Sequence, residues 1–286
     1  NILMNMSSRL VIALGIAGCV ITAGCDLSAG RMIGFGACIS GMLLQRMDYS
    51  GKFFPDMQPL NVFVVALIAM LVCAAFGTVT GFFIAYLNVP PFIATLAMME
   101  IVYGIGLIVT NATPLGGYVE QYTNVSNGKF LGINYLIWIA IIVAAITWFI
   151  FNMTRHGKYM YAIGGNPQAA EVAGVPVKAT LILIYMKAAA MYGLAGFMLG
   201  AKAGGASVQT GYGYEMEAIA ACTIGGVSVT GGRGKVSSAI IGVAVFELLK
   251  VALQYLGMNA NAQYIAIGVV IFIAISLDIR KYIARK

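Results

Sequence analysis

Long uncharged apolar runs, separated by short polar connections, dominate the pattern along this chain. A helix needs about 20 mostly apolar residues to cross the hydrocarbon core of a bilayer, and several runs reach or approach that length. The predicted membrane helices are 8–23, 31–47, 60–86, 92–110, 131–152, 179–200, 216–231, 237–256 and 261–279. The pattern therefore predicts an all-α polytopic membrane helix bundle with about nine transmembrane segments, organised as one domain over residues 1–286.

The charged connections predict which ends of the helices face the cytoplasm. Basic side chains gather in the connection 152–178 and at the C-terminus. They are Arg155, His156, Lys158, Lys178, Arg280, Lys281, Arg285 and Lys286. Cytoplasmic loops collect Lys and Arg, so both segments are placed in the cytoplasm. The chain between them must then cross the membrane an even number of times, which makes 216–231 a crossing. The polar connections 45–59 and 111–129 fall outside, and 87–91 falls inside.

Composition supports a membrane protein and excludes other classes. Apolar residues make up 60% of the chain and charged residues 9%, with a mean hydropathy of +0.90, whereas soluble domains carry about 25% charged residues. Topology explains the net charge of +7 better than nucleic-acid binding does, because the cations lie mostly between apolar runs. The five cysteines lie in apolar segments without metal-binding spacing, and His156 stands alone, so no metal site is expected.

Two interrupted segments echo one another and divide the chain into two related halves. Gly24-Cys-Asp-Leu-Ser-Ala-Gly-Arg31 resembles Gly226-Val-Ser-Val-Thr-Gly-Gly-Arg233, and each lies between apolar runs. Broken helices at corresponding positions of two halves indicate a transport pathway, whereas ordinary tight turns between helices fit the same residues. Glycines at every fourth residue, such as Gly77 and Gly81, predict close helix packing. The candidate pathway residues are Asp26, Ser28, Gly30, Tyr212, Ser228, Thr230 and Gly231.

Several charges interrupt the apolar runs. An acid at membrane depth is costly and functional by default, but Asp26 also suits a helix cap together with Ser28, with Arg31 as its partner. Glu247 and Lys250 are three residues apart on one predicted helix, which allows them to pair. An ion-driven secondary transporter would use Glu100 or Glu247 as its ion site, although no linked relay of acids accompanies either residue.

A short helix is predicted inside the basic connection, in the sequence Asn166-Pro-Gln-Ala-Ala-Glu-Val-Ala-Gly174. Asn166 is a favoured N-cap, and Pro167 suits the first helical position because its missing N–H would be unpaired there. Gly174 is a natural C-terminal glycine. A helix this short is marginal in water, so it must pack on the bundle or on a partner protein.

Four stretches of the chain resemble the permease subunits of bacterial ATP-binding-cassette (ABC) importers for monosaccharides, the ribose, arabinose and galactose group. They are VIALGIAGCVITAGCDLSAGR (11–31), YLNVPPFIATLAMMEIVY (86–103), YAIGGNPQAAEVAGVPV (161–177) and YEMEAIAACTIGGVSVTGGRG (214–234). With the end of the chain at 255–278 they cover most of its length. Within the family the resemblance is strongest to the galactose/methyl-galactoside permeases. Ribose or another small solute is the alternative cargo.

The resemblance implies an architecture and a set of partners. The family has about ten helices per subunit, with another transmembrane helix before the position of Asn1, and works as a homodimer in the bacterial inner membrane. The implied ATPase-coupling helix comprises Gly164, Gly165, Asn166, Pro167, Ala169, Ala170, Glu171 and Gly174. A periplasmic or lipid-anchored sugar-binding protein would deliver the cargo.

The resemblance also accounts for the absence of catalytic residues. The chain has no phosphate-binding loop of the form G-x-x-x-x-G-K-[ST]. ATP and Mg²⁺ are therefore expected on a partner ATPase, and this chain is expected to be a non-catalytic permease with no cofactor of its own. A membrane receptor is the alternative from another class, but it would need a folded output domain, and no stretch of sequence predicts one.

Overall fold

The computed structural model describes residues 2–283, apart from the side chains of residues 260, 274, 275 and 277–283. Arg285 and Lys286, and the side chains of Arg280 and Lys281, lie outside the described residues. The prediction of a cytoplasmic C-terminus, which depends on these cations, therefore stays a prediction.

Within residues 2–283 the chain forms twelve helices and one short antiparallel hairpin, in which Lys129 pairs with Asn134. The helices are α1 (Ile2–Ile21), α2 (Ala29–Leu43), α3 (Val62–Tyr86), α4 (Pro91–Thr110), α5 (Glu120–Asn127), α6 (Tyr135–Met153), α7 (Arg155–Gly165), α8 (Pro167–Val172), α9 (Val177–Ala203), α10 (Tyr214–Gly225), α11 (Val236–Tyr255) and α12 (Ala260–Ile283). The hairpin strands are β1 (Lys129–Phe130) and β2 (Ile133–Asn134).

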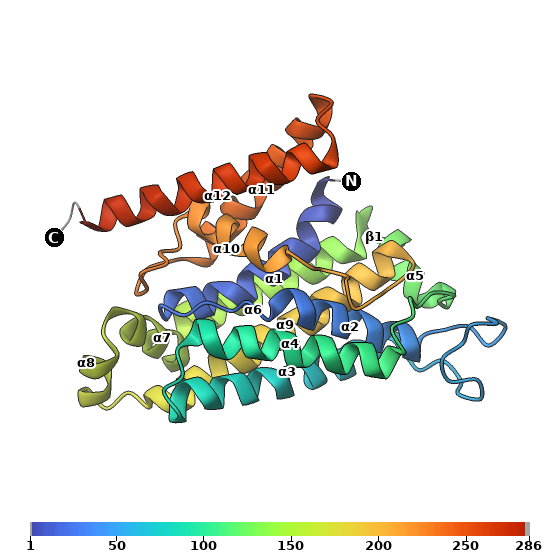
Figure 1. The fold of residues 1–286 in the computed structure, drawn as a ribbon, viewed down its shortest axis with the longest axis horizontal. Coiled ribbons are helices and arrows are strands. Elements are labelled where there is room, and N and C mark those ends of the chain that lie inside the picture. Colours follow the sequence, from blue (N-terminus) through green and yellow to red (C-terminus); the bar gives the residue numbers. More distant parts are fainter. Residues whose placement is uncertain (1, 284–286) are drawn as a thin grey trace.

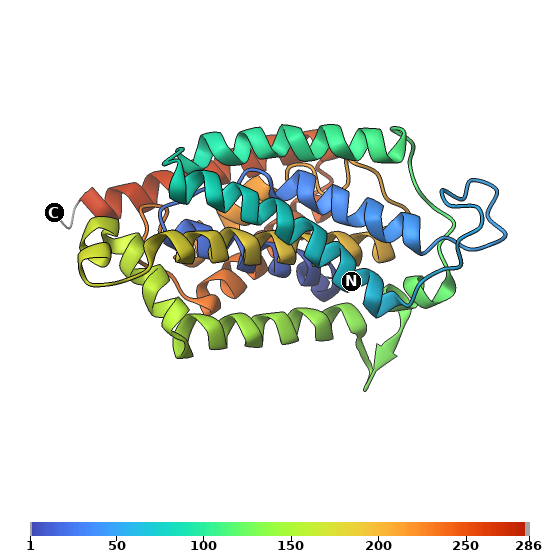
Figure 2. The ribbon, with the colours of Figure 1, turned by 90° about the horizontal axis from the view of Figure 1, so that it is seen from below.

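The long helices lie side by side, so the molecule has two distinct ends (Figure 1). Helices α7 and α8 lie at one end, called here the α8 end. Helix α5, the hairpin β1–β2 and the connection 44–61 lie at the other, called the hairpin end. Figure 2 shows α9 running through the middle of the bundle, with α6 on one side and α3 and α4 on the other. The helical bundle itself agrees with the prediction.

Among the described residues, six helices are long and apolar enough to cross a membrane: α1, α3, α4, α6, α9 and α11. The predicted polytopic helix bundle is confirmed, and six of the nine predicted segments correspond to these helices. Of the other three predicted spans, 31–47 becomes α2 with 15 residues and 216–231 becomes α10 with 12 residues. The third, 261–279, falls within α12, and its described apolar stretch covers Asn261–Ile273. Helix α10 ends early because Gly226 adopts a φ of 102°, which closes the helix with a left-handed residue.

Helix α9 forms the centre of the bundle and packs closely on α1, α2 and α3. Small residues make this close packing possible, as the spacing of the glycines predicted. A Cβ on Gly77 would lie 2.4 Å from the Tyr185 carbonyl oxygen, and one on Gly196 would lie 2.2 Å from the Ile33 carbonyl oxygen. Because lipid provides little hydrophobic drive between helices, such backbone-to-backbone contacts stabilise the bundle through van der Waals packing.

Candidate functional site

Helix α8 has the predicted capping. The Asn166 side chain accepts a hydrogen bond from the Ala169 backbone N–H at 3.0 Å, and Pro167 occupies the first helical position. After the helix, Gly174 adopts a φ of 82° and donates its N–H to the Glu171 carbonyl at 3.0 Å. The caps explain why a helix of only six residues begins and ends where it does.

The faces of α8 differ in exposure. Ala170 is 4% exposed and fastens the helix to its own protein, whereas the apolar side chain of Val172 is 91% exposed. Helix α7, which precedes α8, was missed by the sequence reasoning. Its N-cap is Thr154, whose hydroxyl accepts from the Gly157 N–H at 3.3 Å. This Thr signal was present in the sequence, but the basic residues of α7 were interpreted as a loop.

The two echoing segments meet at the α8 end. Gly232 donates its N–H to the Ile21 carbonyl at 2.8 Å, and a Cβ on Gly231 would lie 2.9 Å from the Ala23 Cβ. One segment connects α1 to α2 and the other connects α10 to α11. Of the two interpretations left open, these residues fit turns between helices. A Cβ on Gly164 of α7 would lie 1.8 Å from the Ile21 carbonyl oxygen, so α7 packs directly on the junction.

Asp26 is buried in the α1–α2 turn, with 2% of its surface exposed. Its Oδ1 accepts hydrogen bonds from the Ser28 N–H at 3.0 Å and the Ser28 hydroxyl at 2.6 Å. Burial raises the pKa of the Asp26 carboxyl above its ordinary value, and the hydrogen bonds from Ser28 oppose that rise. The predicted contact with Ser28 is present, but the predicted helix cap is not, because α2 begins after Ser28 without a side-chain cap hydrogen bond. Arg31 is not the partner of Asp26, because its guanidinium turns toward α4 and the segment 204–213.

The chain after α9 is split into a non-helical segment, 204–213, which is made mostly of turns, and the short helix α10. Residues 204–213 start at the hairpin end, where Ala206 pairs with Leu115, and continue along α2. A Cβ on Gly34 would lie 2.7 Å from the Val208 carbonyl oxygen, so this glycine allows the segment 204–213 to pack closely on α2. Helix α10 then carries the chain to the α8 end. The interruption in the second half thus precedes α10, whereas the sequence placed it at Gly226.

Arg31 lies at the point where these segments meet. Its guanidinium carbon is 4.0 Å from the centroid of the Tyr103 ring and 4.5 Å from that of the Tyr212 ring. Arg31 Nη1 donates a hydrogen bond to Gln209 Oε1 at 2.7 Å, and Gln209 Nε2 donates one to the Tyr103 hydroxyl at 3.0 Å. We call these four residues the Arg31 cluster. Of its members, only Tyr212 was among the candidate pathway residues.

Glu215 lies where the N-termini of α2 and α10 converge. A Cβ on Gly30 would lie 2.0 Å from Glu215 Oε2. The residue Glu215 is 6% exposed. Helix N-termini carry partial positive charge, which stabilises a carboxylate placed there. Arg31 is near enough to Glu215 for the two side chains to attract each other. The predicted candidate Gly30 is a close-packing position beside this carboxylate.

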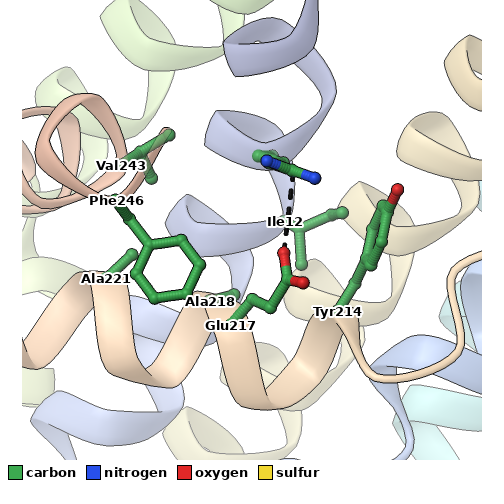
Figure 3. Close-up of a pocket in the computed structure, with 8 residues that line it drawn as sticks. Ile12, Tyr214, Glu217, Ala218, Ala221, Val243 and Phe246 are labelled. Carbon is green, nitrogen blue, oxygen red and sulfur yellow. Dashed lines mark ion pairs between the residues drawn. The ribbon is translucent and has the colours of Figure 1, made fainter. Parts of the chain in front are cut away.

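A network of four charged side chains connects α1, α10 and α11. Arg9 forms ion pairs with Glu247 and, at 3.7 Å, with Glu217, while Lys250 pairs with Glu217. Figure 3 shows the Glu217 carboxylate close to Tyr214 and Ile12, with Phe246 of α11 on the other side of the pocket. The predicted pairing of Glu247 with Lys250 is therefore wrong. Each residue instead pairs with a partner on another helix.

The charged network borders a cavity of about 210 Å³ between α1, α10, α11 and α12. Most of its lining side chains are polar or charged. They include Asn5, Arg9, Tyr214, Glu217, Glu247, Lys250, Gln254, Gln263 and Tyr264. Because the lining cations and anions pair with each other, the network needs no bound ion to balance it. Glu247 therefore lacks the free carboxylate expected of an ion-driven carrier, and Glu100 lies exposed on α4.

The candidate pathway residues divide into two groups. The first group lies in two turns that pack against each other. Asp26 and Ser28 belong to the α1–α2 turn. The α10–α11 turn contains Ser228, Thr230 and Gly231, and the hydroxyls of Ser228 and Thr230 are 2.9 Å apart. Gly30 and Tyr212 belong instead to the junction at the start of α10.

Sequence reasoning missed the residues that complete these sites. Arg9, Tyr103, Gln209, Glu215 and Glu217 were not proposed as site residues. Each charged or amide side chain in an apolar stretch could have been recognised as unusual from the sequence, but the sequence does not show which side chain it contacts.

The described residues contain no cluster of His, Cys, Asp and Glu that would hold a metal ion. His156 is half-buried on α7, and this burial, together with the nearby Lys187 charge, lowers its pKa to about 4. Its imidazole is therefore neutral at physiological pH. The five cysteines are free thiols, four of them buried, which agrees with their predicted packing role.

Comparisons with known proteins match the chain along almost its full length. Residues 1–275 match the family described as branched-chain amino acid transport system / permease component. The galactose/methyl galactoside import permease protein MglC of Escherichia coli is 42% identical over 293 residues, which cover 100% of this chain and 87% of that protein. The protein of the same name from Haemophilus influenzae shows the same identity and coverage.

A more distant relative is named for a different substrate. The ribose import permease protein RbsC of Escherichia coli is 32% identical over 285 residues, which cover 98% of this chain and 85% of that protein. No solved structure matches the chain.

Proposed function

Since the chain belongs to the family of transport-system permease components, we propose that it is the membrane subunit of an ABC importer for galactose or a methyl galactoside. The observation that carries this proposal is 42% identity over the whole chain to the galactose/methyl galactoside permeases of two bacteria. The resemblance predicted from the residues is confirmed by these matches. The protein is a non-catalytic permease subunit of a bacterial inner membrane.

The chemistry of the broken crossing supports a neutral cargo. Half-helix N-termini inside a membrane attract anionic substrate groups, but here Glu215 and Glu217 occupy the first turn of α10. The dipole of α10 is thus compensated by its own carboxylates. An uncharged sugar suits a path in which the fixed charges are already balanced. We place this path along the Arg31 cluster and the α1–α2 and α10–α11 turns.

Helix α8 is proposed as the coupling helix that docks on a cytoplasmic ATPase subunit. Its exposed Val172 suits an apolar pocket on a partner, and its buried Ala170 anchors it to the permease. Movement of α8 would pass through α7 to Gly164, which packs on the backbone of Ile21 and Gly232. The coupling helix is thereby connected to both turns at the α8 end.

The remaining partners follow from this assignment. Two copies of the permease would enclose the path as a homodimer, and about nine or ten transmembrane segments per subunit, in two related halves with broken helices, would surround it. The partner ATPase would bind ATP and Mg²⁺. A periplasmic or lipid-anchored sugar-binding protein would deliver the sugar, so few strong sugar ligands are needed in this chain.

Reconstitution tests the proposal directly. Proteoliposomes would contain the permease and its ATPase, with ATP inside and the sugar-binding protein outside, and uptake of labelled galactose would be measured. We expect uptake that requires both ATP and the binding protein. Uptake driven by a proton or sodium gradient without ATP would show a secondary transporter instead.

The same vesicles distinguish ribose as the alternative cargo, which the 32% identity to the ribose permease suggests. Unlabelled galactose and unlabelled ribose would each compete with labelled galactose. We expect competition by galactose alone. ATP-driven uptake of ribose in place of galactose would retain the importer assignment and change its cargo.

A further inference from the structure

Arg31 is a cation inside the bundle that forms none of the ion pairs found among the described side chains. Its stacking partner Tyr103 lies near the middle of α4, which spans Pro91–Thr110, so the Arg31 cluster lies well inside the membrane. A charge at that depth is expensive and marks a solute path by default. Water or a polar solute must therefore reach the cluster.

The cluster presents hydrogen-bond donors beside an exposed aromatic ring. A guanidinium carries five N–H donors, and among the described residues Arg31 donates one hydrogen bond, to Gln209. Tyr212 is 63% exposed and Gln209 is also exposed, while Arg31 is partly exposed. An aromatic face next to free donors is the arrangement that binds a sugar ring, because the ring has an apolar C–H face and hydroxyl acceptors on its edge.

The local charge balance favours a neutral ligand over an ionic one. The Arg31 charge repels cations, as an arginine does in a selective pore. Glu215, beside the start of α2, offsets that charge and weakens the attraction for an anion. A neutral polyhydroxylated molecule remains as the ligand that both the donors and the ring accept.

We propose that Arg31, Gln209 and Tyr212 form a monosaccharide contact subsite in the permease, with Tyr103 holding the guanidinium in place. The sugar ring lies against Tyr212, and its hydroxyls accept hydrogen bonds from Arg31 and Gln209. This subsite rests on the proposed function as a sugar importer. It adds a point of sugar selection inside the membrane, separate from the binding protein.

The test uses the complete importer in proteoliposomes with the wild-type binding protein in every arm. Uptake of labelled galactose and of its monodeoxy analogues would be measured for Tyr212→Ala, Tyr212→Phe and Arg31→Gln. Tyr86→Ala is a matched control, because Tyr86 is 50% exposed and lies under a cation, Lys178, whose nitrogen is 5.2 Å from the ring centroid. Uptake ratios between sugars within one preparation do not depend on how much permease has folded.

We expect Tyr212→Ala to lower galactose uptake by about fivefold to tenfold and Tyr212→Phe to retain it, because the ring supplies the contact. Arg31→Gln should reduce the preference for galactose over one monodeoxy analogue by about tenfold, since that hydroxyl loses a charged donor. Tyr86→Ala should leave rates and ratios unchanged.

Each other result overturns the subsite in a recognisable way. Wild-type rates and sugar ratios in all variants refute the subsite and leave the proposed function intact. An equal loss for every sugar, with Tyr212→Phe as impaired as Tyr212→Ala, shows that the cluster only holds the segment 204–213 in place. Absence of ATP-driven galactose uptake by the wild-type importer refutes the proposed function, and the subsite with it.

Discussion

At the scale of single residues, the charged network shows how the chain accommodates ions inside a membrane protein. Glu247 is 2% exposed and pairs with Arg9, although 238 residues separate them in the sequence. Taking two charges out of water is costly, and the pair offsets that cost only while both members are present. Removing Glu247 leaves Arg9 with only its longer pairing, to Glu217 at 3.7 Å.

We therefore predict that Glu247→Ala destabilises the protein by about 3–5 kcal/mol, because the Arg9 charge loses its principal partner. Thermal unfolding in detergent, followed with a thiol-reactive dye that detects the four buried cysteines, measures this loss. Asp48→Asn is the control, since its pairing with Arg46 at 3.6 Å is exposed and exposed pairs contribute about 0–1 kcal/mol. A similar small effect for both variants would contradict the prediction.

A second prediction compares two adjacent glycines. Gly164→Ala places a methyl group 1.8 Å from the Ile21 carbonyl oxygen, whereas a Cβ on Gly165 meets no atom within 4 Å. Backbone cannot move aside as a flexible side chain does, so we expect Gly164→Ala to cost about 1–3 kcal/mol. Gly165→Ala should unfold at the wild-type temperature. Equal melting temperatures for the two variants would show that α7 does not pack on α1 as described.

Residue patterns predicted α8 but not the Arg31 cluster, because the residues that define α8 are close together in the sequence and those of the cluster are far apart. The caps of α8 lie within nine residues of sequence, Asn166–Gly174, so the sequence alone specifies them. Arg31 and Gln209 are 178 residues apart, and their contact depends on the path of the segment 204–213 across α2. The sequence analysis named Arg31 only as the partner of Asp26, five residues away, and so missed its distant partners.

At the scale of secondary-structure elements, apolar run length predicted five of the six long spans within about four residues at each end, but placed the start of α1 at residue 8 instead of Ile2. It overestimated α10, because the run 216–231 contains glycines that close the helix at Gly226. It missed α5 and α7, since eight and eleven residues of mixed polarity do not form an apolar run. Hydrophobic length reports a crossing only when one helix makes the whole crossing.

Helix α8 provides the prediction at this scale. Val172→Asp places a charge on the most exposed apolar side chain of the proposed coupling helix, so ATPase binding should weaken by about tenfold or more, as for loss of a central interface contact. Co-purification of the ATPase with the permease measures binding, and the melting temperature of the permease should not change.

Leu131→Asp is the matched control for this test. Leu131 is 78% exposed and lies between β1 and β2 at the opposite end of the molecule, so its replacement should leave ATPase binding intact. Binding that is equally weak in both variants would indicate a general defect in the protein. Full binding by Val172→Asp would remove α8 as the docking element.

At the scale of the whole molecule, the bundle has two ends that differ in structure. The α8 end carries α7, α8 and the two echoing turns, and the hairpin end carries α5 and β1–β2 (Figure 1). Basic residues of 152–178 lie at the α8 end, and such residues favour the cytoplasmic side. The sequence thus predicts orientation from charge, and the fold adds which turns share the cytoplasmic side with α8.

Cysteine labelling in intact cells tests that orientation. Val172→Cys and Leu131→Cys each place an exposed thiol at one end, and a membrane-impermeant maleimide reports which end faces outward. We expect labelling of Leu131→Cys in intact cells and of Val172→Cys only after the cells are opened. Native cysteines should stay silent, because four are buried and burial raises the pKa of the Cys25 thiol to about 11, which keeps it protonated at neutral pH. Labelling of Val172→Cys from outside would reverse the orientation and place α8 beyond the reach of any cytoplasmic ATPase.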